Sequence, residues 1–580
     1  MRLIRQLKFI LSTINVKLDI GLILLIFIGT LLESLSIGLV IPFIVFLING
    51  NSFTHLPFIH YFGLLSEGTS SHEMQSLKIL AAIFGIYFLK ASFLTFTTQR
   101  QSKFVHSVEL SLSEKTLESY LSHNYDFFLK NSASKFIQNI YTNSNNLAIY
   151  LNSSLHFFSD SFLLIVIAVI LFFFQPVRIL IISTIIALLL FAFLKFTRTY
   201  NRKWGAVKSS SDQQRLKLLT NAFQIMKDIK LYNKEVYFLN KFKAINKKSV
   251  NASKNHSIFL KLPSLWLDVF AIFGIGILVG TMGMQGRKVD DILPILGLYA
   301  VATFRILPIA NRLLYNYQLM KFHTSIVEQI SSDLEKVREL ESINHFVSNE
   351  LSTVQLEFRG INFSYNDFDK NVYEDLNFKI VRGEFVGIIG KSGAGKTTLI
   401  DLLSGLLTPD SGEIYFNGDR VENSSMFFKN RIGYVSQSVK LLEDSILHNI
   451  ALGVELEKID MAQVKKVIEI AQIDEVISKL EYGIDTLIGE KGVQLSDGQQ
   501  QRIAIARALY DNPSILIFDE ATNSLDTEVE GEIMNVIHKL KGSKTVIMIS
   551  HKISILDECD QVYKIENGKI IKVDRLDEVI

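Results

Sequence analysis

The chain has 580 residues, a formal net charge of +2 and a mean hydropathy of +0.26. Its length predicts several domains, and its near-neutral charge argues against a nucleic-acid-binding protein, which usually carries a strong basic excess. Only 20% of the residues are charged, and the apolar residues crowd the first half, which excludes an ordinary soluble protein. The single cysteine, Cys559, excludes an intramolecular disulfide and a structural cysteine–zinc site.

The first half of the sequence predicts an α-helical membrane domain of six long transmembrane helices. Apolar stretches long enough to span a bilayer lie at about Ile20–Ile48, Leu77–Thr98, Leu155–Phe174, Val177–Thr197, Leu262–Met284 and Ile292–Tyr317. The basic lead of residues 1–17 places the N-terminus in the cytoplasm, and an even number of crossings returns the C-terminus there. No small-residue cleavage site follows the first apolar run, so we expect a retained multi-pass protein of the cytoplasmic membrane.

The connections between these spans are of two kinds. Residues 49–76 contain no Lys or Arg, as expected outside the cell, and residues 55–65 there fit either a short surface helix or an ordinary loop. Lys-rich stretches of roughly 55 residues follow the second and fourth spans, and helical legs of about 25 residues would reach roughly 37 Å into the cytoplasm. We expect short coupling helices at their tips, near residues 123–135 and 221–235.

The pattern changes after the last span. Residues 1–335 are predicted as the transmembrane domain, and residues 336–350 as a charged linker. From residue 351 to 580, short apolar runs alternate with turns and helical stretches, which predicts a cytoplasmic α/β P-loop ATPase domain with a parallel sheet.

A glycine-rich stretch between an apolar run, Phe385–Ile389, and a predicted helix, Leu399–Leu407, carries the strongest functional signal. Glycine backbone can curl its N–H groups around an anion at a helix N-terminus, so this stretch predicts a nucleotide phosphate loop rather than an ordinary turn. Its candidate nucleotide-binding residues are Gly390, Ser392, Gly393, Ala394, Gly395, Lys396, Thr397 and Thr398. Lys396 would reach the β- and γ-phosphates, and the Thr397 hydroxyl would hold Mg²⁺.

Two carboxylates end a second apolar run, Ile515–Glu520, which predicts a central parallel strand with functional residues at its carboxyl end. Asp519 would orient Mg²⁺ and its waters. Glu520 would act on the water that attacks the γ-phosphate.

Together these residues resemble the ATP-binding cassette transporters over about residues 351–572. The run Leu495–Arg502 is similar to the family's L-S-G-G-Q signature, in which Ser496, Gly498 and Gln499 would contact nucleotide, but Asp497 replaces a glycine there. The resemblance further implies adenine stacking by Tyr365, Mg²⁺ sensing by Gln437, a D-loop contact by Asp526 and γ-phosphate contact by His551. It implies ATP and Mg²⁺ as cofactors, and ATP hydrolysis coupled to transport.

In this family the signature closes over ATP bound by a second domain. One such domain with about six spans resembles an exporter half-transporter that must pair with another chain. Because the catalytic positions match the family, the resemblance favours a homodimer, and a heterodimer with a degenerate partner is the alternative.

The transported substrate is indicated by two short stretches, Glu33–Phe43 and Phe304–Arg312, which look like those of bacterial lipid-linked oligosaccharide flippases. Lys90 and Arg305 fall inside predicted spans, where two copies could face a pyrophosphate group; snorkelling or pairing with Glu33 is the alternative. Export of a lipid A-like molecule, a hydrophobic drug or a peptide is the competing hypothesis. A non-transporting membrane regulator switched by ATP is a hypothesis of another class.

Overall fold

The computed structural model describes residues 2–17, 19–49, 72–174, 176–284, 289–340, 354–365, 371–421, 428, 431–489, 492–521 and 527–573. These residues fall into two compact units, Met1–His123 with Asn131–Ile343, and Asn124–Lys130 with Asn344–Ile580. The surface segment considered at residues 55–65 lies outside the described residues.

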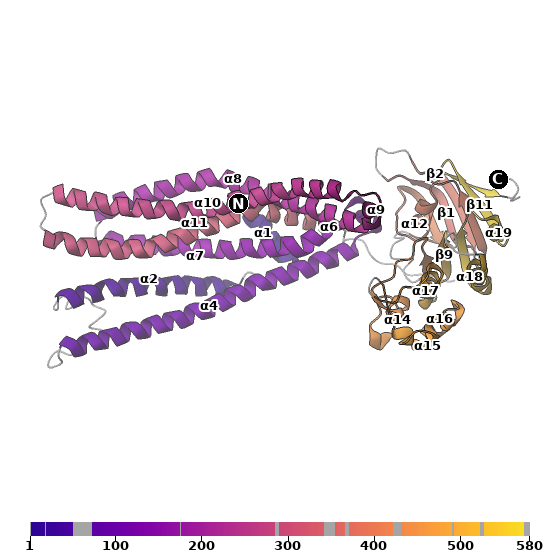
Figure 1. The fold of residues 1–580 in the computed structure, drawn as a ribbon, viewed down its shortest axis with the longest axis horizontal. Helices are drawn as coiled ribbons and strands as arrows, with labels where there is room; N and C mark the ends of the chain where they lie inside the picture. Colours follow the sequence, from indigo (N-terminus) through magenta and orange to yellow (C-terminus); the bar gives the residue numbers. More distant parts are fainter. Residues whose placement is uncertain are drawn as a thin grey trace. The chain divides into compact units, whose positions relative to one another are not determined.

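Long helices build the first unit, and each predicted span lies inside one of them (Figure 1). In chain order the elements are α1 (Arg2–Thr13), α2 (Ile20–Asn49), α4 (His72–Ser122), α6 (Ala133–Ile137), a π-helical turn (Gln138–Asn143), α7 (Ser144–Phe174), α8 (Pro176–Gln224), α9 (Met226–Leu231), α10 (Glu235–Met284) and α11 (Val289–Leu340). By length and composition alone, Ala133–Val169 and Glu235–Ile277 could cross a membrane, among the residues that the structure describes.

Short helices lie where the tips of the polar stretches were expected. α5 (Tyr125–Lys130) falls within residues 123–135 and groups with the second unit, whereas α9 falls within residues 221–235. α11 continues to Leu340, five residues beyond the expected end of the membrane domain, because the polar stretch after the last span keeps forming helix.

Small apolar clusters and polar bridges hold the first unit together. One cluster joins Ile10 and Leu11 of α1 to Val108 of α4, Leu147 of α7 and Val327 of α11. α1 is amphipathic, so its apolar side packs inward while Arg5 and Lys8 stay exposed. This helix therefore fastens to the bundle through one face.

One very close helix crossing shapes the same unit. A Cβ added to Gly205 of α8 would lie 1.8 Å from the carbonyl oxygen of Phe322 in α11. Since no side chain fits that gap, a glycine is required where the two helices touch. Figure 1 shows α8, α10 and α11 running side by side in this unit, and all three pairs pack against one another.

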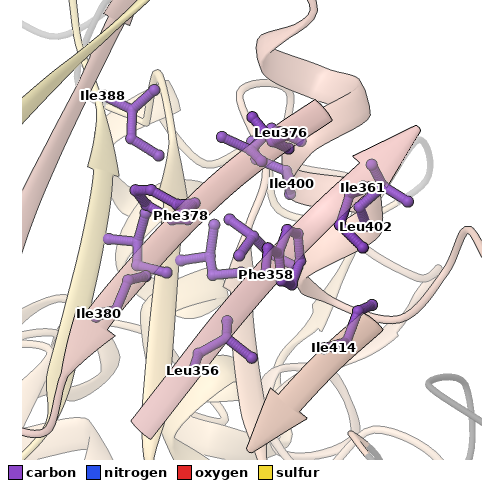
Figure 2. Packing of buried hydrophobic residues seen from close by; sticks show 14 of the residues in the cluster. Leu356, Phe358, Ile361, Leu376, Phe378, Ile380, Ile388, Ile400, Leu402 and Ile414 are labelled. Atoms are coloured by element: carbon purple, nitrogen blue, oxygen red, sulfur yellow. The ribbon is translucent and has the colours of Figure 1, made fainter. Parts of the chain in front are cut away.

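The second unit contains two larger sheets. In the first, the antiparallel order is β2–β1–β4–β5, with β1 (Val354–Phe363), β2 (Tyr373–Val381), β4 (Ser411–Phe416) and β5 (Asp419–Arg420). Figure 2 shows Phe358 and Phe378 of this sheet packed with Leu376 and with Ile400 of α12 (Lys396–Leu403). These residues form a continuous apolar core beside the phosphate loop.

The second sheet has the order β12–β11–β3–β10–β9–β6. Its strands are β3 (Phe385–Gly390), β6 (Ile432–Val435), β9 (Ile515–Asp519), β10 (Thr545–Ile549), β11 (Gln561–Glu566) and β12 (Lys569–Val573), all parallel except β12. Every residue of β10 is buried, as expected for a central strand covered on both faces. The α/β architecture expected after residue 351 is therefore present.

Shorter elements complete this unit. They are β7 (Asp444–Ser445), α14 (Ile446–Ile450), α15 (Met461–Ile470), α16 (Asp474–Ser478), β8 (Leu487–Ile488), α17 (Asp497–Tyr510), α18 (Thr527–Leu540) and α19 (Ile553–Leu556). The helix expected at Leu399–Leu407 instead starts at Lys396 and ends at Leu403. It ends early because Gly405 adopts a positive φ of 70°, which is typical of a helix C-terminus.

Candidate functional site

The candidate site lies where four parallel strands end. β3 leads into the phosphate loop and β6 leads toward Gln437. β9 ends at Asp519, directly before Glu520, and β10 is followed by His551. Because these strands are neighbours in the order β3–β10–β9–β6, their carboxyl ends share one edge of the sheet. Residues up to 161 positions apart in the sequence, from Gly390 to His551, are thereby brought together.

The phosphate loop has the backbone that its glycines predict. Gly393 and Gly395 have φ angles of +79° and +106°, a region that other residues rarely adopt. The Tyr373 hydroxyl donates a 2.8 Å hydrogen bond to the Gly395 carbonyl, directly before α12 begins at Lys396. The loop is therefore fixed at a helix N-terminus, where backbone N–H groups are available to an anion.

The remaining loop residues differ in exposure. Ser392 and Thr397 are exposed, Ala394 is half-buried, and the buried Thr398 hydroxyl lies 2.9 Å from that of Tyr365. Tyr365, the expected adenine-stacking residue, is half-buried and is thus held next to the loop.

Lys396 is the centre of a charged network. Its Nζ donates to the Gly390 carbonyl at 2.8 Å, and it lies 2.9 Å from His551 Nε2 and 3.4 Å from Glu520 Oε1. The side chains of Lys396 and Glu520 are only 10% and 15% exposed. The ammonium group is therefore held among the residues that sequence reasoning assigned to phosphate binding and water activation.

Glu520 connects the other members of this network. Its Oε2 accepts a 2.8 Å hydrogen bond from Gln437 Nε2, and its Oε1 lies 3.1 Å from His551 Nε2. Its φ of +48° is uncommon for a residue other than glycine, and such backbone strain often accompanies functional sites. The strand-end turn thus directs this carboxylate toward the loop.

Asp519 interacts with two residues that sequence reasoning did not select, Tyr434 and Asp401. The Tyr434 hydroxyl donates to Asp519 Oδ2 at 3.1 Å, and burial together with the Asp519 charge raises the pKa of Tyr434. Burial, and next the Asp519 charge, raises the pKa of Asp401 to about 6. Burial is also the main cause that raises the pKa of Asp519 itself. Two carboxylates close together at a half-buried site favour a cation between or beside them.

The donor atoms offered by Thr397, Gln437 and Asp519 are oxygens, which suits Mg²⁺. The described residues contain no group of three or more His, Cys, Asp or Glu side chains that could hold a metal ion. Mg²⁺ commonly combines one or two carboxylates with substrate phosphate oxygens, so this sparse donor set fits Mg²⁺ bound together with a nucleotide.

The signature segment forms a well-capped helix start. Ser496 Oγ accepts from the Gln499 backbone N–H, and the Gln499 side chain accepts from the Ser496 N–H, a capping box that begins α17. Gly498 lies half-buried and Asp497 exposed in the first turn. Among the described residues, no hydrogen bond joins this segment to the phosphate loop.

Three other predicted residues are not among the described residues of this site. Asp526 lies outside the described residues, and Arg305 lies in α11 without a described side chain. Lys90 in α4 places its Nζ 5.3 Å from the centre of the Tyr87 ring.

The residues missed by sequence reasoning are Asp401 of α12 and two tyrosines, Tyr373 and Tyr434, which lie on strands beside the site. Tyr434 belongs to the short strand before Gln437 and pairs in parallel with β9, so the strand order could have revealed its proximity to Asp519. No motif marks either tyrosine.

Two family models match the chain. Residues 373–523 match the family described as ABC transporter, and residues 20–306 match the ABC transporter transmembrane region. They correspond to the ATPase domain of the second unit and to most of the helical unit.

Curated relatives match a smaller part of the chain than the two family models do. The chain is 39% identical over 216 residues to an ATP-dependent lipid A-core flippase of Pasteurella multocida (strain Pm70), covering 37% of each chain. It is 39% identical over 229 residues to the alpha-hemolysin translocation ATP-binding protein HlyB of Escherichia coli, covering 39% of this chain and 32% of that protein. The matched region is thus less than half the length of either relative.

A solved structure extends the comparison to nearly the whole chain. The structure of a bacterial Atm1-family ABC exporter with ATP bound superposes with a TM-score of 0.78, covering 97% of this chain and 95% of that one. At 20% sequence identity this likeness establishes the fold. The chain is therefore an ABC exporter by fold, with one ABC transmembrane region followed by one ABC ATPase domain, the arrangement of a half-transporter.

Proposed function

We propose that this protein is an ATP-driven exporter of the cytoplasmic membrane that flips an amphipathic lipid-linked oligosaccharide from the inner to the outer leaflet. The observation that carries the ATP-driven part is the convergence of Lys396, Glu520, His551 and Gln437 beside the phosphate loop. Phosphoryl transfer needs mainly positioning and charge stabilisation, which such a constellation supplies.

Each residue has a role that its position supports. The loop N–H groups and Lys396 bind the β- and γ-phosphates, and Tyr365 is proposed to stack on the adenine base. Glu520 positions the attacking water and accepts its proton, while His551 stabilises charge on the γ-phosphate. Thr397, Gln437 and Asp519 would hold Mg²⁺, which would supply charge neutralisation to the phosphates.

The active form is proposed to be a homodimer with composite ATP sites. Ser496, Gly498 and Gln499 stand at the N-terminus of α17, which favours an anion, yet they make no hydrogen bond to the loop of their own chain among the described residues. A second copy would bring this helix start to the first copy's γ-phosphate. Asp526 would also act across that pairing. Asp497 adds a negative charge there and weakens the contact relative to a glycine.

The membrane part is proposed to cross the bilayer six times, with both termini in the cytoplasm. The predicted spans all lie within helices, and the family model of the transmembrane region covers residues 20–306. Short helices α5 and α9, at the expected tips, would transmit closure of the ATPase domains.

The substrate assignment rests on sequence resemblance to the bacterial flippase PglK around residues 33–43 and 304–312. Lys90 and Arg305 would contribute positive charge for a pyrophosphate linker. The alternative substrate is a lipid A-like molecule, which the names of several relatives favour, among them that of Pasteurella multocida. Peptide or hydrophobic drug export, and a role as an ATP-switched regulator, remain further alternatives.

ATP turnover tests the energetic part of the proposal. The purified full chain in lipid vesicles should hydrolyse ATP at least about 100-fold faster than its Glu520→Gln variant, because a positioned base contributes about 10²–10⁴. A wild-type rate no greater than that of Glu520→Gln would mean that the protein is not an ATP-driven exporter.

Flipping assays test the substrate. Vesicles containing either a fluorescent lipid-linked oligosaccharide or a fluorescent lipid A would show which one moves between leaflets in an ATP-dependent manner. The Lys90→Ala/Arg305→Ala double variant should move about tenfold fewer oligosaccharide-lipids per ATP hydrolysed, as expected for loss of charge-assisted contacts. Lys243→Ala, an exposed lysine of α10, serves as the matched control. Selective movement of lipid A would replace the first assignment with the second.

A further inference from the structure

Three cations gather where α8 and α11 cross. Arg198 and Arg202 are one helical turn apart and, together with Gly205, lie on one face of α8. Gly205 touches the backbone of Phe322, the residue after Lys321, so the crossing brings Lys321 to the same place. We call Arg198, Arg202 and Lys321 the basic cluster.

A contact with α11 supports this placement of the cluster. Arg202 donates from Nη2 to both carboxylate oxygens of Glu328, at 2.9 Å each. Glu328 follows Lys321 by seven residues and therefore lies on the same helix face. Arg198 and Arg202 are close enough for their positive charges to act on Lys321.

The cluster has more positive than negative charge. Within the described part of the chain, the basic cluster has one ion pair, between Arg202 and Glu328. Neither Arg198 nor Lys321 has an ion-pair partner there. Lys321 is half-buried, with its Nζ 5.3 Å from the centre of the Tyr317 ring. Arg198 and Arg202 are exposed, and three cations beside one carboxylate leave a local excess of two positive charges, which favours binding of an anion.

The position of the cluster indicates the kind of anion. The predicted spans end at Thr197 and Tyr317, so in the proposed orientation the basic cluster lies at the cytoplasmic boundary of the membrane. Exposed aromatic side chains beside it, Phe196 and Tyr200 at 60% and 45% exposure, are typical of this boundary. Phosphate head groups of lipids lie at this depth, and basic pockets between helices bind them.

We propose that the basic cluster binds the phosphate head group of a membrane amphiphile, and that this amphiphile is the pyrophosphate-linked substrate on the cytoplasmic leaflet. This inference rests on the proposed function. Glu328 orients the Arg202 guanidinium, while Arg198 and Lys321 provide donors for phosphate oxygens. The cluster is thus a recognition site for the substrate before it is flipped.

The chain contains a suitable reporter. It has two tryptophans, and Trp204 lies two residues after Arg202, with its ring 4.8 Å from that of Phe259. In the full chain carrying Trp266→Phe, the fluorescence of Trp204 can be followed in phosphatidylcholine vesicles. Three probes separate the sources of phosphate: a polyprenyl pyrophosphate in the bilayer, phosphatidylglycerol in the bilayer, and inorganic pyrophosphate in solution.

We expect polyprenyl pyrophosphate to change the fluorescence saturably, and Arg198→Gln/Lys321→Gln to weaken its apparent affinity by at least about tenfold. Lys321→Arg should retain most of the affinity, because the charge remains. Lys203→Gln, an exposed cation on another side of α8, should bind as the parent does. Arg198→Gln alone should show a smaller loss, and it keeps the test informative if the double variant folds poorly.

Three results would overturn the inference. They are unchanged binding in the double variant, an equal response to phosphatidylglycerol, or an equal response to inorganic pyrophosphate. The flipping assay with the parent chain decides the proposed function separately. A parent that flips the oligosaccharide-lipid together with a double variant that binds normally would refute the basic cluster alone.

Discussion

The ATPase unit and the membrane unit differ in how they distribute polar and apolar residues between interior and surface. In the ATPase unit, Phe358, Ile388 and Phe518 are at most 1% exposed. In the membrane unit, Asn201 and Gln318 are fully buried, whereas Phe84 and Ile272 are 72% and 74% exposed. A unit whose outer surface faces lipid gains nothing from burying more apolar area, so its helices associate through close packing and polar contacts.

This difference determines which substitutions each unit tolerates. In the ATPase unit, the cost of a substitution should follow the apolar volume that is removed from the core. In the membrane unit, the cost should follow the closeness of helix contact and the pairing of buried charge. The predictions below test that distinction.

Removal of core volume should have the largest effect. Phe358→Ala is expected to destabilise the ATPase unit by about 3–5 kcal/mol, because it leaves a cavity in the core shown in Figure 2. Hydrogen exchange of β1 and β2 peptides in the full chain measures the loss locally. Val381→Ala, at a 40% exposed position of β2, should change exchange little. Equal effects at both positions would contradict a volume-dominated core.

Addition of a single methyl group should be the next most costly change. Gly205→Ala would place a Cβ 1.8 Å from the Phe322 oxygen, so α8 and α11 must separate, at a cost of about 2–3 kcal/mol. Thermal unfolding of the full chain in detergent measures this loss. At Gly274 of α10 a Cβ meets no atom within 4 Å, so Gly274→Ala is the control. A tolerated alanine at Gly205 would show that close crossing does not hold this unit.

Loss of a buried charge pair should cost about 1–3 kcal/mol. Asp160 of α7, 5% exposed, accepts a 2.9 Å hydrogen bond from Arg312 of α11, which is 54% exposed. Asp160→Ala should lower the unfolding temperature in detergent. Arg312→Ala, which leaves the buried carboxylate unpaired, should lower it more. The double variant should then be more stable than Arg312→Ala; purely additive losses would exclude coupling between the two charges.

The smallest effect concerns the nucleotide site. Tyr434→Phe removes the hydrogen bond to Asp519 Oδ2, worth about 1 kcal/mol, and should raise the Mg²⁺ concentration needed for half-maximal ATP hydrolysis about fivefold. The maximal rate at saturating Mg²⁺ should change less. Tyr415→Phe, on the other sheet, is the control, because its hydroxyl donates to Glu413 instead. An unchanged Mg²⁺ requirement would remove Tyr434 from the metal site.

The same contrast explains which features could be predicted from the sequence. The phosphate loop, the strand ending at Asp519 and the residues Gln437 and His551 follow from motifs, because parallel strands bring their carboxyl ends to one edge. Helix facing in the membrane unit did not follow, since apolar residues surround these helices and no periodicity marks the inner side. Gly205 and Asp160 therefore became meaningful only with the structure. Tyr434 was missed because hydrogen bonds between strands depend on register, which local patterns do not specify.

The network around Lys396 affects the order of nucleotide binding and water activation. With the phosphate loop in this conformation, the lysine has the carboxylate of Glu520 and the ring of His551 as neighbours, at 3.4 Å and 2.9 Å. An arriving γ-phosphate competes with that carboxylate for the same ammonium group. On the proposed function, Glu520 becomes available to a water molecule only as the triphosphate takes over its counter-ion. Glu520 would then stay unable to activate water until ATP is bound, which limits hydrolysis in the resting exporter.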